Sequence, residues 1–157
     1  EGHDDPGAAL HWGLWVVGGV LLSGGVVVGA AGGRRTALPA AMASGVLFGL
    51  MTVAVRVVGG VDPFQPAEIL ADPAAYAVVL CGAGGFYLFP AALQPGAVAG
   101  AAAAVGVGET VIPGVVGAVL LGDSARSGWG PVMVIAFVAA IGGAVVVALS
   151  DGVAAVE

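Results

Sequence analysis

Five apolar runs, each long enough to cross a membrane as a helix, constrain this chain more than any other feature. A helix needs about 20 predominantly apolar residues to cross the hydrocarbon core of a bilayer. Transmembrane strands alternate apolar and polar residues, whereas these runs are apolar on every face. The sequence therefore predicts an all-α integral membrane protein, a polytopic bundle of five transmembrane helices. The runs are 13–31, 38–58, 74–93, 97–121 and 129–149.

Composition supports a membrane protein and excludes several other classes. Of the 157 residues, 59% are hydrophobic and 9% are charged, whereas ordinary globular domains carry about 25% charged residues. The formal net charge is -6 and every basic residue is an arginine, so nucleic acid is not an expected partner. The single cysteine, Cys81, cannot form an internal disulfide, and we expect it to be an apolar packing residue. His3 and His11 have no partners at metal-ligand spacing, so we expect no metal, no cofactor and no role for either histidine.

Polar segments separate the runs and predict the loops. The longest, 59–72, is broken by prolines and carries acidic residues, so it is too polar for a sixth span; a short interfacial helix at 66–71 fits it. The N-terminal EGHDDPG is acidic and lacks an initiator Met, so it resembles neither a signal peptide nor a natural start, and we expect the chain to be a fragment. The predicted loops are 32–36, 59–72, 94–96 and 122–128.

Aromatic residues at the N-terminal sides of several runs predict an interfacial belt. Amphipathic rings favour the headgroup region of a bilayer, although each ring taken alone would also fit a packing role. We expect Arg56 to extend toward the same interface; a counter-charge to Glu109 or to a substrate is the alternative. The arginine pair at 34–35 favours a cytoplasmic loop and an external N-terminus. The expected anchors are Trp12, Trp15, Tyr76, Trp129 and Arg56.

Glu109 is the one acidic residue inside an apolar run. A charged carboxylate at mid-membrane costs at least a few kcal/mol, so it needs a polar partner, a proton or a cavity. Thr110 adds a hydroxyl beside it. Pro113 cannot donate a helix hydrogen bond to the Glu109 carbonyl, which predicts a free acceptor and a kink. These three residues predict a substrate or proton site; the alternative is that Glu109 only bonds a neighbouring helix.

Two further polar residues belong to this predicted site. The Tyr87 hydroxyl lies inside a run and needs a partner, for which Glu109 is a candidate, and Gln94 follows the same run. Ser23, Ser44 and Thr52 are expected instead to bond carbonyls of their own helices.

Small residues spaced four apart predict places where helices approach closely. With 29 glycines in the chain, such pairs also arise by chance, so each pair is a hypothesis. They are Gly25/Gly29, Gly45/Gly49 and Gly96/Gly100.

The run 87–123 resembles the penultimate part of the drug/metabolite transporter superfamily, specifically the EamA-like permeases. In that family a helix ends in a pattern like A-L-Q-x-G, and the next helix carries a mid-span Glu and ends in Leu-Gly-Glu or Leu-Gly-Asp. Here the corresponding residues are ALQPG at 92–96, Glu109, and LGD at 121–123. Segment 40–58 looks like the first helix of an EamA repeat, and the last run looks like its final helix.

The resemblance covers about 39–149 and includes two departures. Segment 59–73 stands where the repeat has its second helix, and Thr110, not a proline, follows the mid-span Glu. The resemblance implies that 1–36 is the last helix of a preceding repeat with a short loop. It also implies that 37–157 is an EamA-like repeat with four transmembrane helices.

What the resemblance implies for function is secondary transport. Members of the family move small organic solutes or metabolites by alternating access between inverted repeats, in a bundle of about nine or ten helices. The expected setting is multi-pass in the cell membrane, with proton coupling through Glu109 as one alternative. The expected partners are the lipid bilayer, a small-molecule substrate, and the missing N-terminal half or a second copy. A non-transporting structural subunit of a larger complex is the competing hypothesis. An enzyme is disfavoured, because the runs hold no pair of titratable residues for acid and base.

Overall fold

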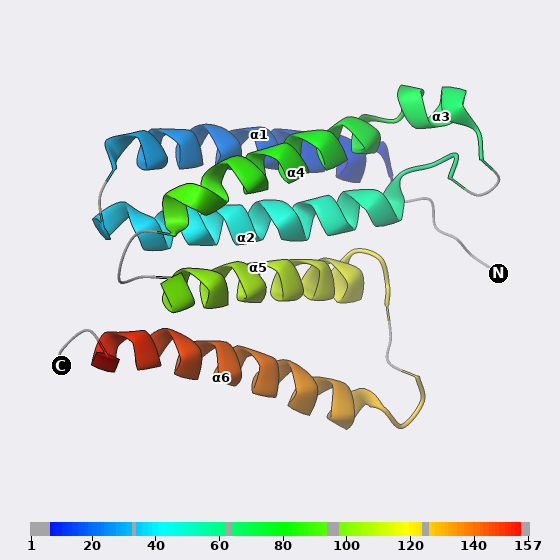
Figure 1. Ribbon diagram of the computed structural model, residues 1–157. Helices are drawn as coiled ribbons and strands as arrows, with labels where there is room; N and C mark the ends of the chain where they lie inside the picture. Colours follow the sequence, from blue (N-terminus) through cyan, green and yellow to red (C-terminus); the bar gives the residue numbers. More distant parts are fainter. Residues whose placement is uncertain (1–6, 33, 62–63, 94–97, 124–125, 155–157) are drawn as a thin grey trace.

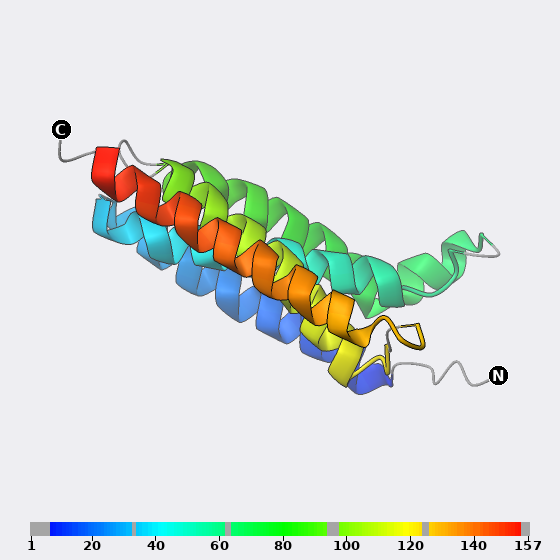
Figure 2. The same cartoon turned by 90° about the horizontal axis from the view of Figure 1, so that it is seen from below.

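The computed structural model describes residues 7–32, 34–61, 64–93, 98–123 and 126–154, and this part of the chain is helical (Figure 1). Five long helices run side by side, and one short helix projects from one end of the bundle (Figures 1 and 2). No strand occurs in the described ranges, as the sequence predicts. The helices are α1 Ala8–Ala31, α2 Arg34–Val57, α3 Pro66–Ala71, α4 Pro73–Ala92, α5 Val98–Val119 and α6 Gly130–Ala154.

The long helices α1, α2, α4, α5 and α6 are each long and apolar enough to cross a membrane. The protein is therefore a multi-pass membrane protein, which confirms the prediction from the five apolar runs. The short helix α3 coincides with the interfacial helix expected at 66–71. It lacks buried residues, consistent with a segment that lies beside the bundle and not within it.

The connection between α1 and α2 is shorter than the sequence predicts. A loop was expected over 32–36, but α2 already begins at Arg34. Gly32 ends α1 with a φ of 64°, and its amide donates to the Gly29 carbonyl. Glycine adopts this left-handed conformation without steric cost, and arginine is a good helix former. A turn at Gly32 therefore leaves both arginines free to join the next helix.

Helix α2 is the centre of the bundle. It packs against α1, α4 and α5, while α6 packs against α5 at the outside (Figure 1). Its buried residues Leu47 and Val53 meet Leu88 of α4 and Leu14 of α1 in one apolar cluster. Cys81 of α4 is fully buried in the same cluster, as expected for a packing residue. Because α2 has three neighbours, it holds the other helices in place.

The closest helix contact joins α2 to α5 through glycine. A Cβ atom on Gly45 would lie 2.7 Å from the Val105 carbonyl oxygen, and one on Gly49 would lie 2.7 Å from that of Gly108. Backbone therefore meets backbone, which confirms the Gly45/Gly49 pair as a packing motif. In lipid, where no hydrophobic force draws helices together, such close approach is a main source of association.

The other two glycine pairs differ in outcome. Gly25 and Gly29 face α4, where a Cβ on Gly25 would overlap Leu88 and a Cβ on Gly29 would lie 3.7 Å from Ala91. This pair therefore also lies at a helix contact. Gly96 of the third pair lies outside the described residues.

Ser44 corrects one expectation. Its hydroxyl donates to the Gly85 carbonyl of α4 at 2.9 Å and is fully buried, so the expectation of a bond within its own helix was wrong. The facing residue is a glycine, which brings the α4 backbone within reach of the serine. Ser23 and Thr52 do bond their own helices, at Gly19 and Phe48.

Candidate functional site

Glu109 lies near the middle of α5, and the described helices leave it exposed. Its neighbour Gly108 faces α2, where a Cβ would meet Gly45. Thr110 faces the other way, toward α6. Successive residues of a helix are about 100° apart, so Glu109 projects between the faces that α2 and α6 cover. A mid-span carboxylate is thus presented on a surface of the bundle and not buried within it.

A cavity lies on the same face of α5, about two to three turns beyond Glu109 at the C-terminal end of the helix. Val116 and Leu120 follow Glu109 by seven and eleven residues, and residues at these spacings share one helix face. Together with Leu50 of α2 and the first half of α1, they line a space of about 560 Å³. From this part of the chain the lining includes Gly7, which precedes α1, and Ala9, Leu10, Gly13, Leu14 and Val17 of α1. The cavity is apolar, and Glu109 lies on the same side of α5, outside its lining.

Thr110 and Pro113 take different places around Glu109. The Thr110 hydroxyl donates to the Gly106 carbonyl at 2.8 Å, and Thr110 lines a smaller cavity of about 190 Å³ between α5 and α6. Pro113 lies inside the continuous helix. Since proline has no amide hydrogen, it leaves the Glu109 carbonyl without its usual helix donor. The three residues are close in sequence, but Thr110 lines the cavity beside α6 whereas Glu109 lines neither of the two cavities.

Tyr87 is placed apart from Glu109. It belongs to α4, is 65% exposed, and makes no hydrogen bond with Glu109 in the structure. Helices α4 and α5 each pack on α2, and this arrangement keeps the two side chains from meeting. Gln94, also predicted for the site, lies outside the described residues.

The predicted anchors gather at one end of the bundle. The N-terminal ends of α1, α4 and α6 and the C-terminal ends of α2 and α5 lie there together (Figure 1). Trp12, Trp15, Tyr76 and Trp129 are all exposed at these helix ends. The Tyr76 hydroxyl donates to the Leu70 carbonyl of α3 at 2.8 Å. This arrangement matches what an interfacial belt requires.

Arg56 lies at the same end and pairs with Asp123. The Arg56 Nη1 donates to Asp123 Oδ2 and the Arg56 Nη2 donates to Asp123 Oδ1, a bidentate contact. The hydrogen bond from Arg56 lowers the pKa of the Asp123 carboxyl below its ordinary value. Arg56 is therefore bonded to the residue that follows α5, and its partner is not Glu109. The sequence signal for this pair was the LGD pattern, which placed an acid at the end of that helix.

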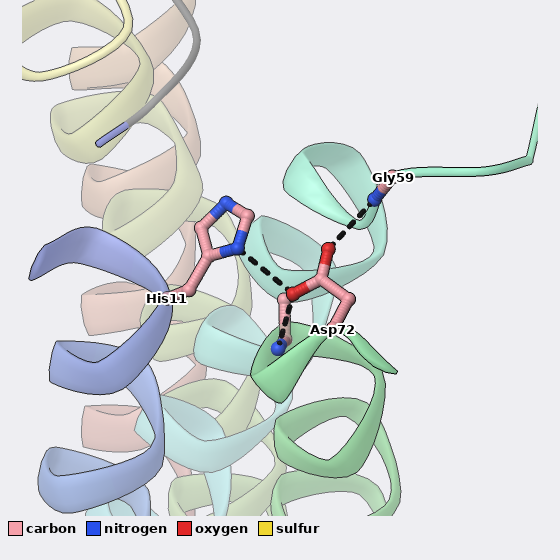
Figure 3. A network of polar contacts seen from close by, with 4 residues as sticks. His11, Gly59 and Asp72 are labelled. Carbon is pink, nitrogen blue, oxygen red and sulfur yellow. Dashed lines mark hydrogen bonds and ion pairs between the residues drawn. The ribbon is translucent and has the colours of Figure 1, made fainter. Parts of the chain in front are cut away.

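A second polar contact at this end joins α1 to the start of α4 (Figure 3). His11 Nδ1 lies 2.8 Å from Asp72 Oδ1, and the amides of Gly59 and Ala74 each donate to the Asp72 carboxylate at 2.8 Å. Burial alone would raise the pKa of Asp72, but the two amides and the His11 ring outweigh it and hold this pKa below its ordinary value. Asp72 thereby connects α1, the segment after α2, and α4.

His11 is a residue that the sequence analysis left without a role. A carboxylate only accepts hydrogen bonds, so Nδ1 carries the proton toward Asp72. Nε2 is buried and has no hydrogen-bond partner among the residues that the structure describes. The signal that could have indicated the contact was Asp72 directly before Pro73, an arrangement typical of a helix N-cap.

Comparisons of the chain with protein families, with curated proteins and with solved structures found no match. Within the described ranges, no group of three or more His, Cys, Asp or Glu side chains could hold a metal ion. The candidate site therefore rests on its own geometry: a mid-span carboxylate, a proline one turn away, and an apolar cavity along the same helix face.

Proposed function

We propose that this protein is a secondary transporter that moves small organic solutes across its membrane by alternating access. The observation that carries the proposal is the placement of Glu109 at mid-span, exposed, on the face of α5 that also lines the 560 Å³ cavity. Intramembrane ionisable residues mark substrate or proton pathways by default, because nothing else offsets the cost of keeping them there. The resemblance of 87–123 to EamA-like permeases supports the same function.

In the proposed mechanism, Glu109 exchanges a proton or contacts a polar part of the solute. The apolar walls formed by Val116, Leu120 and the first half of α1 accommodate the rest of it. The preceding half of a longer transporter, or a second copy of the chain, supplies the remaining wall. As in inverted-repeat transporters, the site then opens to one side of the membrane at a time.

The test is solute-driven proton movement in proteoliposomes. The protein as its gene encodes it is reconstituted with a pH-sensitive dye inside, and a panel of amino acids, sugars, organic cations and carboxylates is added under a pH gradient. We expect at least one solute to dissipate the gradient, and Glu109→Gln to abolish this effect because an amide cannot exchange a proton. Glu68→Gln is the matched control, since Glu68 lies on α3 outside the spans.

Two outcomes would count against the proposal. Transport by Glu109→Gln that equals wild type at every pH would remove Glu109 from the mechanism. A wild-type protein that moves no solute, and that purifies with a fixed partner whether residue 109 is Glu or Gln, would favour the structural subunit instead.

A further inference from the structure

Pro113 divides α5 into two parts that are attached to the bundle in different ways. In the first part, Gly108 lies against Gly45 so closely that a Cβ on Gly108 would be 2.6 Å from the Gly45 carbonyl carbon. Ala101 and Val105 are buried beside this contact. Backbone-to-backbone packing leaves no flexible side chain that could yield, so this part of α5 is fixed on α2.

The second part of α5 is held through side chains, since Val116 packs against the apolar cluster around Leu47 and Gly114 lies against Phe137 of α6. Val119 and Leu120 are exposed, and the cavity of about 560 Å³ separates Val116 and Leu120 from α1. Its firmest polar attachment is at the end, where Asp123 pairs with Arg56 and the Asp123 amide donates to the Gly117 carbonyl at 2.8 Å. A Cβ on Gly117 would occupy the space of the Asp123 carboxylate, so glycine there makes room for the pair.

The opposite wall of the cavity is better anchored. His11 of α1 contacts Asp72, which also accepts the amides of Gly59 and Ala74. Further along, Gly18 and Gly25 of α1 lie against α4. α1 packs on α4 along its length, whereas α5 after Pro113 is attached through side chains and lacks one helix hydrogen bond at the proline, so α5 is the wall that can move.

We propose that the part of α5 after Pro113 is a gate, hinged at Pro113 and held closed by the Arg56–Asp123 ion pair. When the pair separates, this part of the helix swings away from α2 and carries Val116 and Leu120 with it. The cavity then widens toward Glu109. A proline-interrupted helix bends at the missing hydrogen bond, which places the hinge one turn beyond the carboxylate. The role of the gate in transport rests on the proposed function, whereas the movement itself does not.

The test measures access of water to the moving wall. Val116→Cys is introduced into a Cys81→Ala background, and the purified protein in proteoliposomes is modified with a water-soluble methanethiosulfonate reagent. We expect Arg56→Gln and Asp123→Asn each to raise the modification rate about two- to five-fold, the shift that one exposed ion pair gives in an equilibrium. Reversing the pair, with Arg56→Asp and Asp123→Arg together, should return the rate toward wild type.

Three controls separate a hinged gate from general loosening. Arg126→Gln removes the same charge at the same end of the bundle and should leave the rate unchanged. Pro113→Ala should suppress the increase caused by Arg56→Gln, because it restores the hydrogen bond at the hinge. Cysteine at Ala101, in the fixed part of α5, should stay unmodified in every variant.

Equal rates in the wild type and in both single variants would overturn the gate. The gate would also be overturned if cysteines introduced at Ala101 and at Val116 were modified at rates that rise together, because the whole of α5 would then be separating from α2. Labelling is read without any solute, so a protein that transports nothing in the liposome assay can still confirm or refute the gate.

Discussion

Replacing Gly108 by alanine tests whether the α2–α5 contact holds the bundle together. The added Cβ would lie 2.6 Å from the Gly45 carbonyl carbon and 2.9 Å from its Cα, whereas carbon atoms in contact are optimally about 3.5–4.0 Å apart. The two backbones must therefore separate by about 1 Å. A gap of that size removes about a quarter to a half of the van der Waals attraction of each neighbouring contact.

The change in the free energy of unfolding caused by Gly108→Ala follows from two opposing effects. Overpacking of this kind costs about 1–3 kcal/mol, and alanine returns at most about 0.5–1 kcal/mol of helix propensity over glycine. We therefore expect Gly108→Ala to lower the free energy of unfolding by about 0.5–2 kcal/mol. Gly106→Ala is the matched control on the same helix, because a Cβ there meets nothing within 4 Å, and it should be neutral or slightly stabilising.

The assay is reversible unfolding in mixed micelles, with increasing mole fraction of dodecyl sulfate and tryptophan fluorescence as the readout. The wild type, Gly106→Ala and Gly108→Ala are compared at the same protein and lipid concentrations. Equal unfolding midpoints for the two variants would refute the reasoning, since it depends on the different space around two glycines that lie two residues apart.

Two further predictions use the same unfolding assay. Because the pKa of the Asp72 carboxyl is lowered in the folded protein, the charged carboxylate stabilises the fold fully above its ordinary pKa of 3.8, and this stabilisation is lost as pH falls through the lower folded value. Asp72→Asn should lower the free energy of unfolding by about 1 kcal/mol at neutral pH, and the variant should lose less stability than the wild type in acid. Ser44→Ala removes the buried bond to Gly85 and should cost about 0.6 kcal/mol, the usual value between membrane helices, whereas Ser23→Ala, which removes an exposed bond within α1, should change stability much less.

The number and type of the elements were predictable because the bilayer leaves few choices. Each apolar run of about 20 residues must satisfy its own backbone, so it becomes a helix, and the long helices match the expected spans. Small differences arise where local chemistry decides the boundary. Arg34 joins α2 because one glycine at position 32 completes the turn, a detail that hydropathy does not contain.

Contacts between helices were predictable only where they depend on one residue type. The pair Gly45/Gly49 indicated a close approach but not its partner, because small residues at this spacing recur in several runs, among them Ala104 and Gly108. Ser44 illustrates the same limit: its hydroxyl was expected to bond its own helix, and it bonds Gly85 instead. Which helix faces a given residue is decided by the packing of the whole bundle.

Polar side chains at the end of the bundle have different surroundings from Glu109 at its middle. At the end of the bundle, Arg56 pairs with Asp123 and His11 contacts Asp72. A polar group there can pair with a neighbour that the connecting segments bring close. Glu109 lies too deep for such pairing and remains exposed in the described structure. On the proposed function, a mid-span carboxylate that faces outward serves a contact beyond the described helices. A structural role within the bundle would place the Glu109 side chain against another helix, as Ser44 is placed against α4 and Gly108 against α2.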